Sequence, residues 1–179
     1  MRGKLWTVVL GLLVLGLLTV NLQLASAHRW GDWHWNKKTI KVRNTSNFHA
    51  EAEAAINDWD SRTKLKLPRR SKHTNISVFD GNYGKTGWGG LASIKNTGWD
   101  WWCWWWCKVT HGHARYNSYY KNVTKGTGSN SDIRGIFCQE IGHLFGLGHS
   151  NDGCMGKGYF NNLNVVSSHN AKNVNSYTH

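Results

Sequence analysis

The segment 138–150 concentrates side chains that bind metals and move protons. Residues four apart share one face of a helix, so a helix here would point Gln139 and His143 in the same direction. Gly146 can end such a helix in a left-handed turn, because glycine adopts positive φ angles without steric cost. The chain would then return His149 toward His143.

Two imidazoles and an amide oxygen that converge on one point suit Zn²⁺, which accepts nitrogen and oxygen ligands at about 2.0–2.2 Å. A zinc ion with an open fourth position binds water and lowers the pKa of that water to about 7. Glu140 lies beside this point and is the candidate general base. We therefore predict hydrolytic chemistry, with His143 and His149 as metal ligands and Gln139 as a provisional third ligand.

This segment resembles the metzincin zinc metallopeptidases, and among them the matrixin-like group. Their signature is H-E-x-x-H-x-x-G-x-x-H followed by a Met-turn, and the chain matches it at Glu140, His143, Gly146 and His149. Met155 resembles the Met-turn methionine, which lies under the metal site without binding the metal. The sequence departs from the family at Gln139, which replaces the first histidine ligand with a weaker ligand for zinc.

The resemblance covers about residues 40 to 179 and implies a secreted endopeptidase that uses one catalytic Zn²⁺ to hydrolyse peptide bonds in proteins. It also implies that an edge strand containing Leu91 and Ala92 pairs with a protein or peptide substrate. The substitution at Gln139 leaves a second hypothesis open. The chain would then be a weak or inactive metzincin-fold module that binds protein or a cell-surface polymer through a tryptophan-rich loop.

The elements needed to position these residues can be inferred from hydrophobic periodicity. Asn47 is a candidate N-cap for a helix that ends near Ser61, and either Ser167 or Ser168 could cap a short helix toward Tyr177. A helical period also covers 136–147, and strand patterns cover 39–42, 65–67, 75–79, 91–94 and 113–120. This mixture predicts an α+β fold. The resemblance adds a twisted mixed sheet with a first helix, an active-site helix and a C-terminal helix.

The first 27 residues have the pattern of a secretory signal peptide. Arg2 and Lys4 precede an apolar run over 5–20, and the segment closes with the small residues Ala25 and Ala27. We expect cleavage after Ala27, which leaves a single domain over 28–179 outside the cell. The 152 remaining residues carry a formal charge of +10, because the signal contains two basic and no acidic residues.

The four cysteines of an exported chain are expected to form disulfides, and three pairings are open. Sequence proximity favours Cys103 with Cys107 and Cys138 with Cys154. The first pair would close a small loop within 101–107, a segment that contains five tryptophans. Such an aromatic surface could recognise substrate or a polymer, or it could line a substrate cleft.

The remaining expectations concern partners and further metals. The positive charge suits an anionic cell-surface polymer, while nucleic acid and stable membrane insertion are not expected, and we expect a monomer. His111 and His113 share one strand face and form either a second metal site or part of a solvated edge strand. The glycine-rich stretch 81–90 could bind Ca²⁺ through carbonyl groups, but Asp80 is the only acidic residue nearby, so we expect a plain loop.

Overall fold

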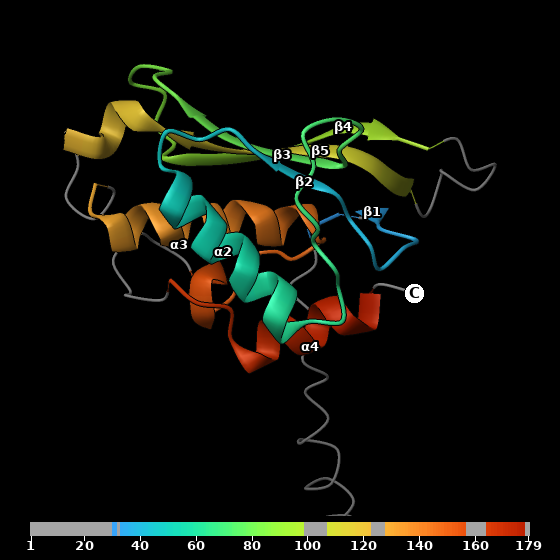
Figure 1. The fold of residues 1–179 in the computed structure, drawn as a ribbon. Helices are drawn as coiled ribbons and strands as arrows, with labels where there is room; N and C mark the ends of the chain where they lie inside the picture. The colour runs from blue at the N-terminus through green and yellow to red at the C-terminus, as the bar shows by residue number, and fades with distance from the viewer. Residues whose placement is uncertain (1–29, 32, 99–106, 123–127, 157–163, 178–179) are drawn as a thin grey trace, which may run out of the picture.

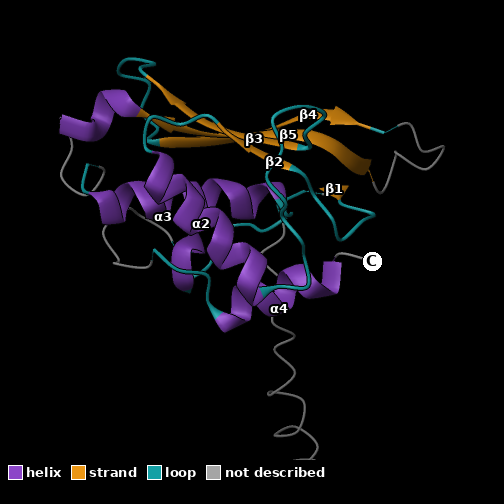
Figure 2. Cartoon of the chain, in the orientation of Figure 1, coloured by secondary structure: helices purple, strands orange, loops and turns teal. Residues whose placement is uncertain are grey.

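The computed structural model describes residues 30–31, 33–98, 107–122, 128–156 and 164–177. These residues form one mixed β-sheet with three α-helices, and the helices all lie on the same side of the sheet (Figures 1 and 2). The expected α+β architecture is therefore confirmed at this level. None of the helices among the described residues is long and apolar enough to cross a membrane.

The sheet contains five strands, which are β1 (Trp33–His34), β2 (Val42–Asn44), β3 (Ile76–Gly81), β4 (Gly90–Thr97) and β5 (Cys107–Asn117). Their order is β1-β5-β3-β2, and β4 pairs separately with β5. β4 is the antiparallel member, whereas the other pairings are parallel. Among the described residues no strand pairs with the other edge of β4, so β4 is an edge strand.

Three α-helices follow the chain in the order α2 (His49–Arg62), α3 (Asn130–Leu144) and α4 (Ser168–Tyr177). α2 and α3 pack together, and α3 also packs against β4 and β5. Two short 3-10 helices, η1 (Ser118–Asn122) and η2 (Gly153–Met155), precede and follow α3. α3 therefore lies between the sheet and the rest of the helical layer, where it can carry a site to the edge at β4.

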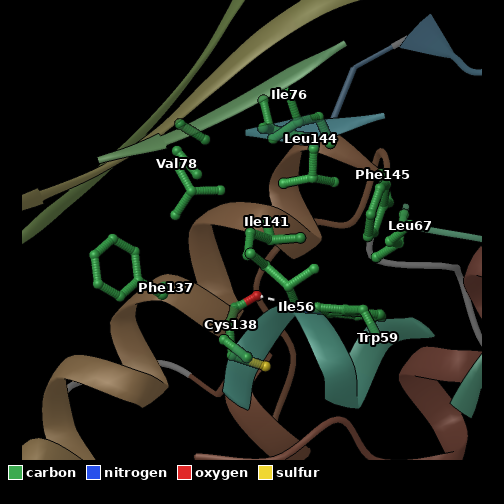
Figure 3. Close-up of a cluster of buried hydrophobic side chains, with 14 of the residues drawn as sticks. Ile56, Trp59, Leu67, Ile76, Val78, Phe137, Cys138, Ile141, Leu144 and Phe145 are labelled. Atoms are coloured by element: carbon green, nitrogen blue, oxygen red, sulfur yellow. Dashed lines mark hydrogen bonds between the residues drawn. The ribbon is translucent and has the colours of Figure 1, made fainter. Parts of the chain in front are cut away.

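The core lies between the inner face of the sheet and helices α2 and α3 (Figure 3). Trp59 of α2 is fully buried, and its indole N–H donates a hydrogen bond of 2.9 Å to the Cys138 carbonyl. This bond gives the buried indole nitrogen a partner, as burial requires. It also fixes α2 against α3 one residue before Gln139.

Several expected boundaries are wrong. Asn47 does not cap α2. The N-cap residue is Phe48, and no side chain hydrogen-bonds to the first turn from this position. The Asn47 backbone N–H instead donates to the Asp80 carboxylate. The segment around Lys66 makes isolated parallel bridges and no full strand. By contrast, the Ser167 hydroxyl accepts from the Asn170 backbone N–H, which agrees with a cap at this position.

The expectation of a solvated edge strand for His111 and His113 is also wrong. Both residues lie on β5, which has β3 on one side and β4 on the other. The sequence pattern marked only the second half of β5. Its first half contains Lys108 and Thr110 and lacks a clear alternation, because a register shift in its pairing with β4 interrupts the period.

Candidate functional site

Both ends of α3 are determined by local sequence. At the start, the Ser129 hydroxyl accepts from the Asp132 backbone N–H, while the Asp132 carboxylate accepts from the Ser129 backbone N–H, each at 3.1 Å. At the end, Gly146 adopts a φ of 88°, and its N–H donates to the His143 carbonyl at 2.9 Å. This turn reverses the chain after α3 and brings the residues that follow back toward the helix.

The turn places the two expected histidine ligands together. The Nε2 atoms of His143 and His149 lie 3.2 Å apart, and the ring centroids are separated by 4.8 Å. Two nitrogens that each bind a tetrahedral zinc at about 2.0–2.1 Å lie about 3.3 Å apart. The observed separation therefore fits two ligands of one metal ion.

The hydrogen bonds of His143 determine which ring nitrogen is available. Its Nδ1–H donates to the Leu147 carbonyl at 2.7 Å, so the neutral ring carries its lone pair on Nε2. The side chain is only 7% exposed, and burial lowers the pKa of His143 to about 4 against the opposing effect of the Leu147 carbonyl. His143 is therefore neutral at physiological pH, which is the form that binds metal.

Trp30, a residue that the sequence analysis did not identify, covers this histidine. Its ring centroid lies 5.0 Å from that of His143, and its backbone N–H donates to the Gly146 carbonyl at 2.8 Å. Trp35 adds a hydrogen bond of 2.7 Å from its indole N–H to the Leu144 carbonyl. The start of the described chain thus packs on the C-terminal end of α3, although its sequence has no period that would have predicted this contact.

Glu140 is buried between α3 and the edge strand, with 5% of its surface exposed. Burial raises the pKa of its carboxyl group to about 8, while a hydrogen bond from the Ala92 backbone N–H and the charge of Arg115 act in the opposite direction. Gly90 is needed for this approach, because a Cβ there would overlap the Glu140 carboxylate. The expected base and the strand expected to bind substrate are therefore in direct contact, while the Leu91 side chain is half-buried.

Gln139 makes its described contact with the turn that contains Met155. Its Nε2 donates to the Gly156 carbonyl at 3.0 Å, which leaves the amide oxygen on the other side of the group. The assignment of Gln139 to the metal thus stays a prediction.

Met155 packs tightly under α3. It is fully buried, and a Cβ at Gly142 would overlap its sulfur and lie 2.8 Å from Trp59 Cζ2. The Ser150 backbone N–H donates to the Met155 carbonyl at 2.7 Å, which closes the loop that follows His149. Gly142 is a second contributor to the site that motif spacing did not reveal.

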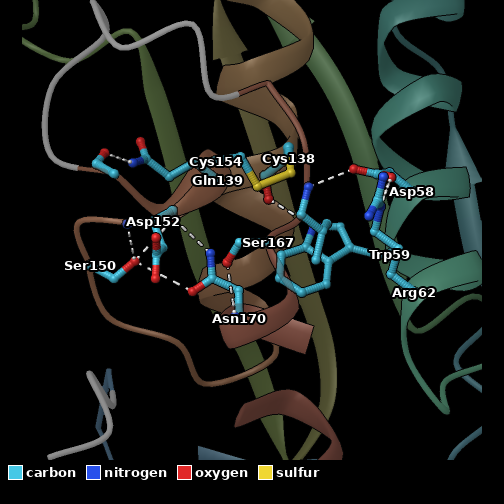
Figure 4. The surroundings of a disulfide bond; sticks show 12 residues. Asp58, Trp59, Arg62, Cys138, Gln139, Ser150, Asp152, Cys154, Ser167 and Asn170 are labelled. Atoms are coloured by element: carbon cyan, nitrogen blue, oxygen red, sulfur yellow. Dashed lines mark hydrogen bonds and ion pairs between the residues drawn. A yellow bond between two sulfur atoms is a disulfide. The ribbon is translucent and has the colours of Figure 1, made fainter. Parts of the chain in front are cut away.

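A disulfide joins Cys138 to Cys154, with the Cα atoms 5.8 Å apart (Figure 4). This bond confirms one of the two pairs favoured by proximity. It connects α3 to η2 at the positions just before Gln139 and Met155. Nearby, the Asn170 side chain donates to the Asp152 carbonyl at 2.8 Å, so α4 supports the same loop.

The other expectations depend in part on residues outside the described ranges. Cys103 and the tryptophans at 101–106 lie there, so the loop and its disulfide to Cys107 stay predictions. Asn117, the last residue of β5, packs against the glycine-rich stretch, and its side-chain amide donates hydrogen bonds to the Gly84 and Trp88 carbonyls. These carbonyls, which were considered as Ca²⁺ ligands, already have a protein donor.

The donor set at the end of α3 fits a zinc ion in part. Two imidazole nitrogens face each other at a suitable separation, and the ring of His143 is oriented by a backbone carbonyl. Within the described ranges, no group of three or more His, Cys, Asp or Glu side chains is arranged to hold a metal ion. A third ligand from the described ranges would be of another type, such as the Gln139 amide oxygen.

Comparison with known proteins does not assign the chain. No protein-family model matches it, and no curated protein matches it significantly. The functional argument consequently depends on the motif and on the geometry around α3.

Proposed function

We propose that this chain is a secreted, zinc-dependent endopeptidase with one domain over 28–179, similar to the matrixin-like metzincins. The observation that carries the proposal is the 3.2 Å separation between the Nε2 atoms of His143 and His149, with the buried Glu140 about one helical turn before His143 on α3. The disulfide is typical of proteins in oxidising compartments and supports an extracellular location.

The metal site would consist of His143, His149 and the amide oxygen of Gln139. When bound, zinc polarises the scissile carbonyl and acidifies the attacking water. The Leu147 carbonyl keeps the Nε2 lone pair of His143 directed at the site. Trp30 covers one side of that ring and reduces the access of bulk water.

Glu140 would act as the general base. With the pKa of its carboxyl group at about 8, Glu140 is largely protonated at neutral pH, and the positive charge of a bound zinc ion would lower that pKa and favour the carboxylate. The carboxylate would then accept the proton of the attacking water and deliver it to the leaving amine. The Ala92 backbone N–H orients the carboxylate toward the edge of the sheet. An extended peptide that adds to the free edge of β4 would present its backbone next to this group.

The first test combines metal analysis with peptide cleavage. The purified, oxidised protein should bind about one zinc per chain and cleave members of a peptide library. Glu140→Ala should abolish cleavage and retain the metal, because Glu140 is not a ligand. Glu51→Ala, which removes a carboxylate from the far end of α2, is the matched control and should behave as the wild type. A wild-type protein that holds no zinc and cleaves no peptide would refute the proposal.

One observation favours the alternative of a binding module with weak or no activity. The Gln139 amide already donates to the Gly156 carbonyl, so its position serves the loop that contains Met155 as well as any metal. Gln139→His separates the two hypotheses. A large gain in zinc affinity and in cleavage would mean that position 139 faces the metal and limits a functional enzyme. A gain in neither would favour the binding module.

A further inference from the structure

One face of the sheet has no helix over it. α2, α3 and α4 all lie on the other side (Figure 1), and the described loop 82–89 packs on this outer face at the end that holds Asn117. Sheets of mainly parallel strands are normally covered on both faces by apolar packing. A face that is left open therefore needs side chains suited to water or to a polar partner.

The strand registers define which side chains share the outer face. Val42, Val78 and Ala114 are buried and point toward the helices, so their neighbours along each strand point outward. One row crosses β2, β3, β5 and β4 through paired positions, and its members are Arg43, Ser77, His113 and Ser93. Arg115 lies on the same face, because its Nη2 donates to the Ser93 hydroxyl at 3.2 Å.

Further cations extend this row along the strands. Lys95 and His111 are close enough to His113 to lower its pKa, and the two imidazole centroids lie 5.2 Å apart. Lys37 donates to the Asn75 side chain at 3.0 Å, which holds it at the end of the face near β5. In total the outer face and this end carry six lysine and arginine side chains, namely Lys37, Lys41, Arg43, Lys95, Lys108 and Arg115.

These six cations form the cationic patch of the outer face. Their positive charges affect the pKa values of groups at both ends of the patch. The pKa of His113 is lowered to about 4, first by burial and then by the positive charges of His111, Lys95 and Arg115. The pKa of Lys37 is lowered by burial and by repulsion from Lys41 and Lys108. Cations that repel one another in this way gain stability when an anion binds between them.

Carboxylates that could neutralise the patch lie elsewhere in the described parts of the chain. Four are on α2, and Asp80 turns away to accept hydrogen bonds from Ser46 and Asn47. Asp132 lies in the capping box of α3, and Glu140 is buried behind β4. The last described carboxylate, Asp152, lies in the loop after α3. The outer face is thus uniformly positive.

We propose that this outer face binds a linear polymer that carries phosphate or sulfate groups. Neighbouring strands lie about 4.8 Å apart, and alternate residues of one strand lie about 6.6 Å apart, so cations distributed over β2, β5 and β4 form an extended array that a flexible polyanion can follow. Arginine can bind a tetrahedral oxyanion with two hydrogen bonds, and the hydroxyls of Ser77 and Ser93 supply further donors between the charges.

The aromatic rings of the face argue against a surface that reads nucleic-acid bases. Phe79 makes an edge contact with His113, with the ring centroids 5.2 Å apart. The ring centroids of Tyr83 and Trp88 lie 5.1 Å apart, and the Arg115 guanidinium lies over the Tyr83 ring. Base stacking needs a free ring face, and the Tyr83 ring already has the Arg115 guanidinium over it and Trp88 beside it. A polymer recognised through its charges alone fits the surface better, and this function is independent of any peptidase activity.

The test measures binding of long-chain polyphosphate and of heparin to the full-length protein as a function of salt. A double variant, Arg43→Thr with Lys95→Thr, removes two cations from the patch. The control, Lys64→Thr with Lys172→Ala, removes the same charge from exposed positions near and on α4. We expect the patch variant to weaken binding about tenfold at about 50 mM salt and to flatten the salt dependence, because fewer counterions are released. The control should retain wild-type affinity.

The outcomes separate the polymers and the alternatives. Tighter binding of polyphosphate or of heparin identifies phosphate or sulfate as the preferred group. Equal losses in the patch and control variants would mean that net charge alone is responsible, which overturns the proposal. Absence of salt-dependent binding would overturn it as well. Single-stranded DNA that binds more tightly than both polymers, and that loses this advantage in Phe79→Leu, would replace it with a nucleic-acid surface. Matched thermal melts confirm that each variant is folded.

Discussion

At the scale of single residues, the candidate site depends on close approaches that only glycine permits. Gly142 and Gly135 both lie in α3, yet their surroundings differ. A Cβ at Gly142 would overlap the Met155 sulfur, whereas a Cβ at Gly135 would have ordinary contacts of 3.6 Å with Asn164. The same substitution at these two positions should therefore have opposite effects on stability.

We predict that Gly142→Ala lowers the free energy of unfolding by about 1–3 kcal/mol, the usual cost of overpacking a filled core. Gly135→Ala should raise it by about 0.5–1 kcal/mol, because alanine favours the helical backbone. Chemical denaturation of both variants checks the prediction. A neutral or stabilising Gly142→Ala would mean that Met155 does not pack against the helix as described.

The spacing of residues predicted the meeting of His143 with His149, because helix geometry and one glycine turn are sufficient to bring them together. It did not predict the Leu147 carbonyl or the Ala92 N–H. Backbone groups are common to all residues, so their roles leave no signature in the sequence. Trp30 was also missed, since a contact made by an irregular segment depends on tertiary packing.

At the scale of elements, β4 must approach α3 closely enough for its backbone to contact Glu140. Gly90 permits this approach at the start of the strand. Gly90→Ala should separate β4 from α3 and reduce peptide cleavage at least about tenfold, because a small misplacement of catalytic groups has large effects on rate. Zinc content should be unchanged, since no proposed ligand moves.

The control for this prediction is Gly98→Ala, just beyond the other end of β4. A Cβ there would meet Lys108 and Thr110 at 3.4 Å, a distance at which small adjustments suffice. Cleavage by this variant should match that of the wild type. Full activity in Gly90→Ala would show that the position of β4 does not matter for the reaction.

The disulfide also connects two elements, because it joins α3 to η2 across a sequence separation of 16 residues. Loop-closure entropy for a loop of this length corresponds to about 3 kcal/mol. The double variant Cys138→Ala with Cys154→Ala should lower the free energy of unfolding by about that amount. Denaturation of the wild type with and without reductant supplies an independent measurement. A variant whose free energy of unfolding equals that of the oxidised wild type would contradict the prediction.

Periodicity predicted elements best where one face is fully buried. α3 follows this rule, since its apolar residues face the core. The start of α3 was placed too late, because its first turn is polar and is stabilised by the capping box. β1 has only two residues and depends on pairing with β5, so no local pattern could have predicted it.

At the scale of the whole molecule, charge is distributed between two layers. Much of the acidic charge lies on α2, whereas the outer sheet face is positive. No local sequence pattern predicted that one face of the sheet has no helix over it, because the number of layers is a property of the assembled fold. Burial and then the neighbouring cations lower the pKa of His113, and this shift links the stability of the protein to pH.

The sign of this link follows from the two pKa values of His113. An unfolded histidine titrates near 6.5, whereas the pKa in the folded protein is about 4. As pH falls from 6.5 toward 4, the unfolded chain binds a proton that the folded protein does not, so His113 makes stability decrease over this range. Above pH 6.5 its contribution is constant.

We therefore predict that His113→Asn reduces the loss of stability between pH 7 and pH 5, because the substituted side chain does not titrate. The difference between variant and wild type isolates His113 from Glu140 and His143, which titrate in both proteins. His73→Asn is the control, since His73 is exposed and asparagine tolerates its positive φ of 51°. Saturating polyphosphate should also reduce the loss in the wild type by favouring protonated His113. Identical pH profiles for wild type and His113→Asn would show that the sheet face does not repel protons.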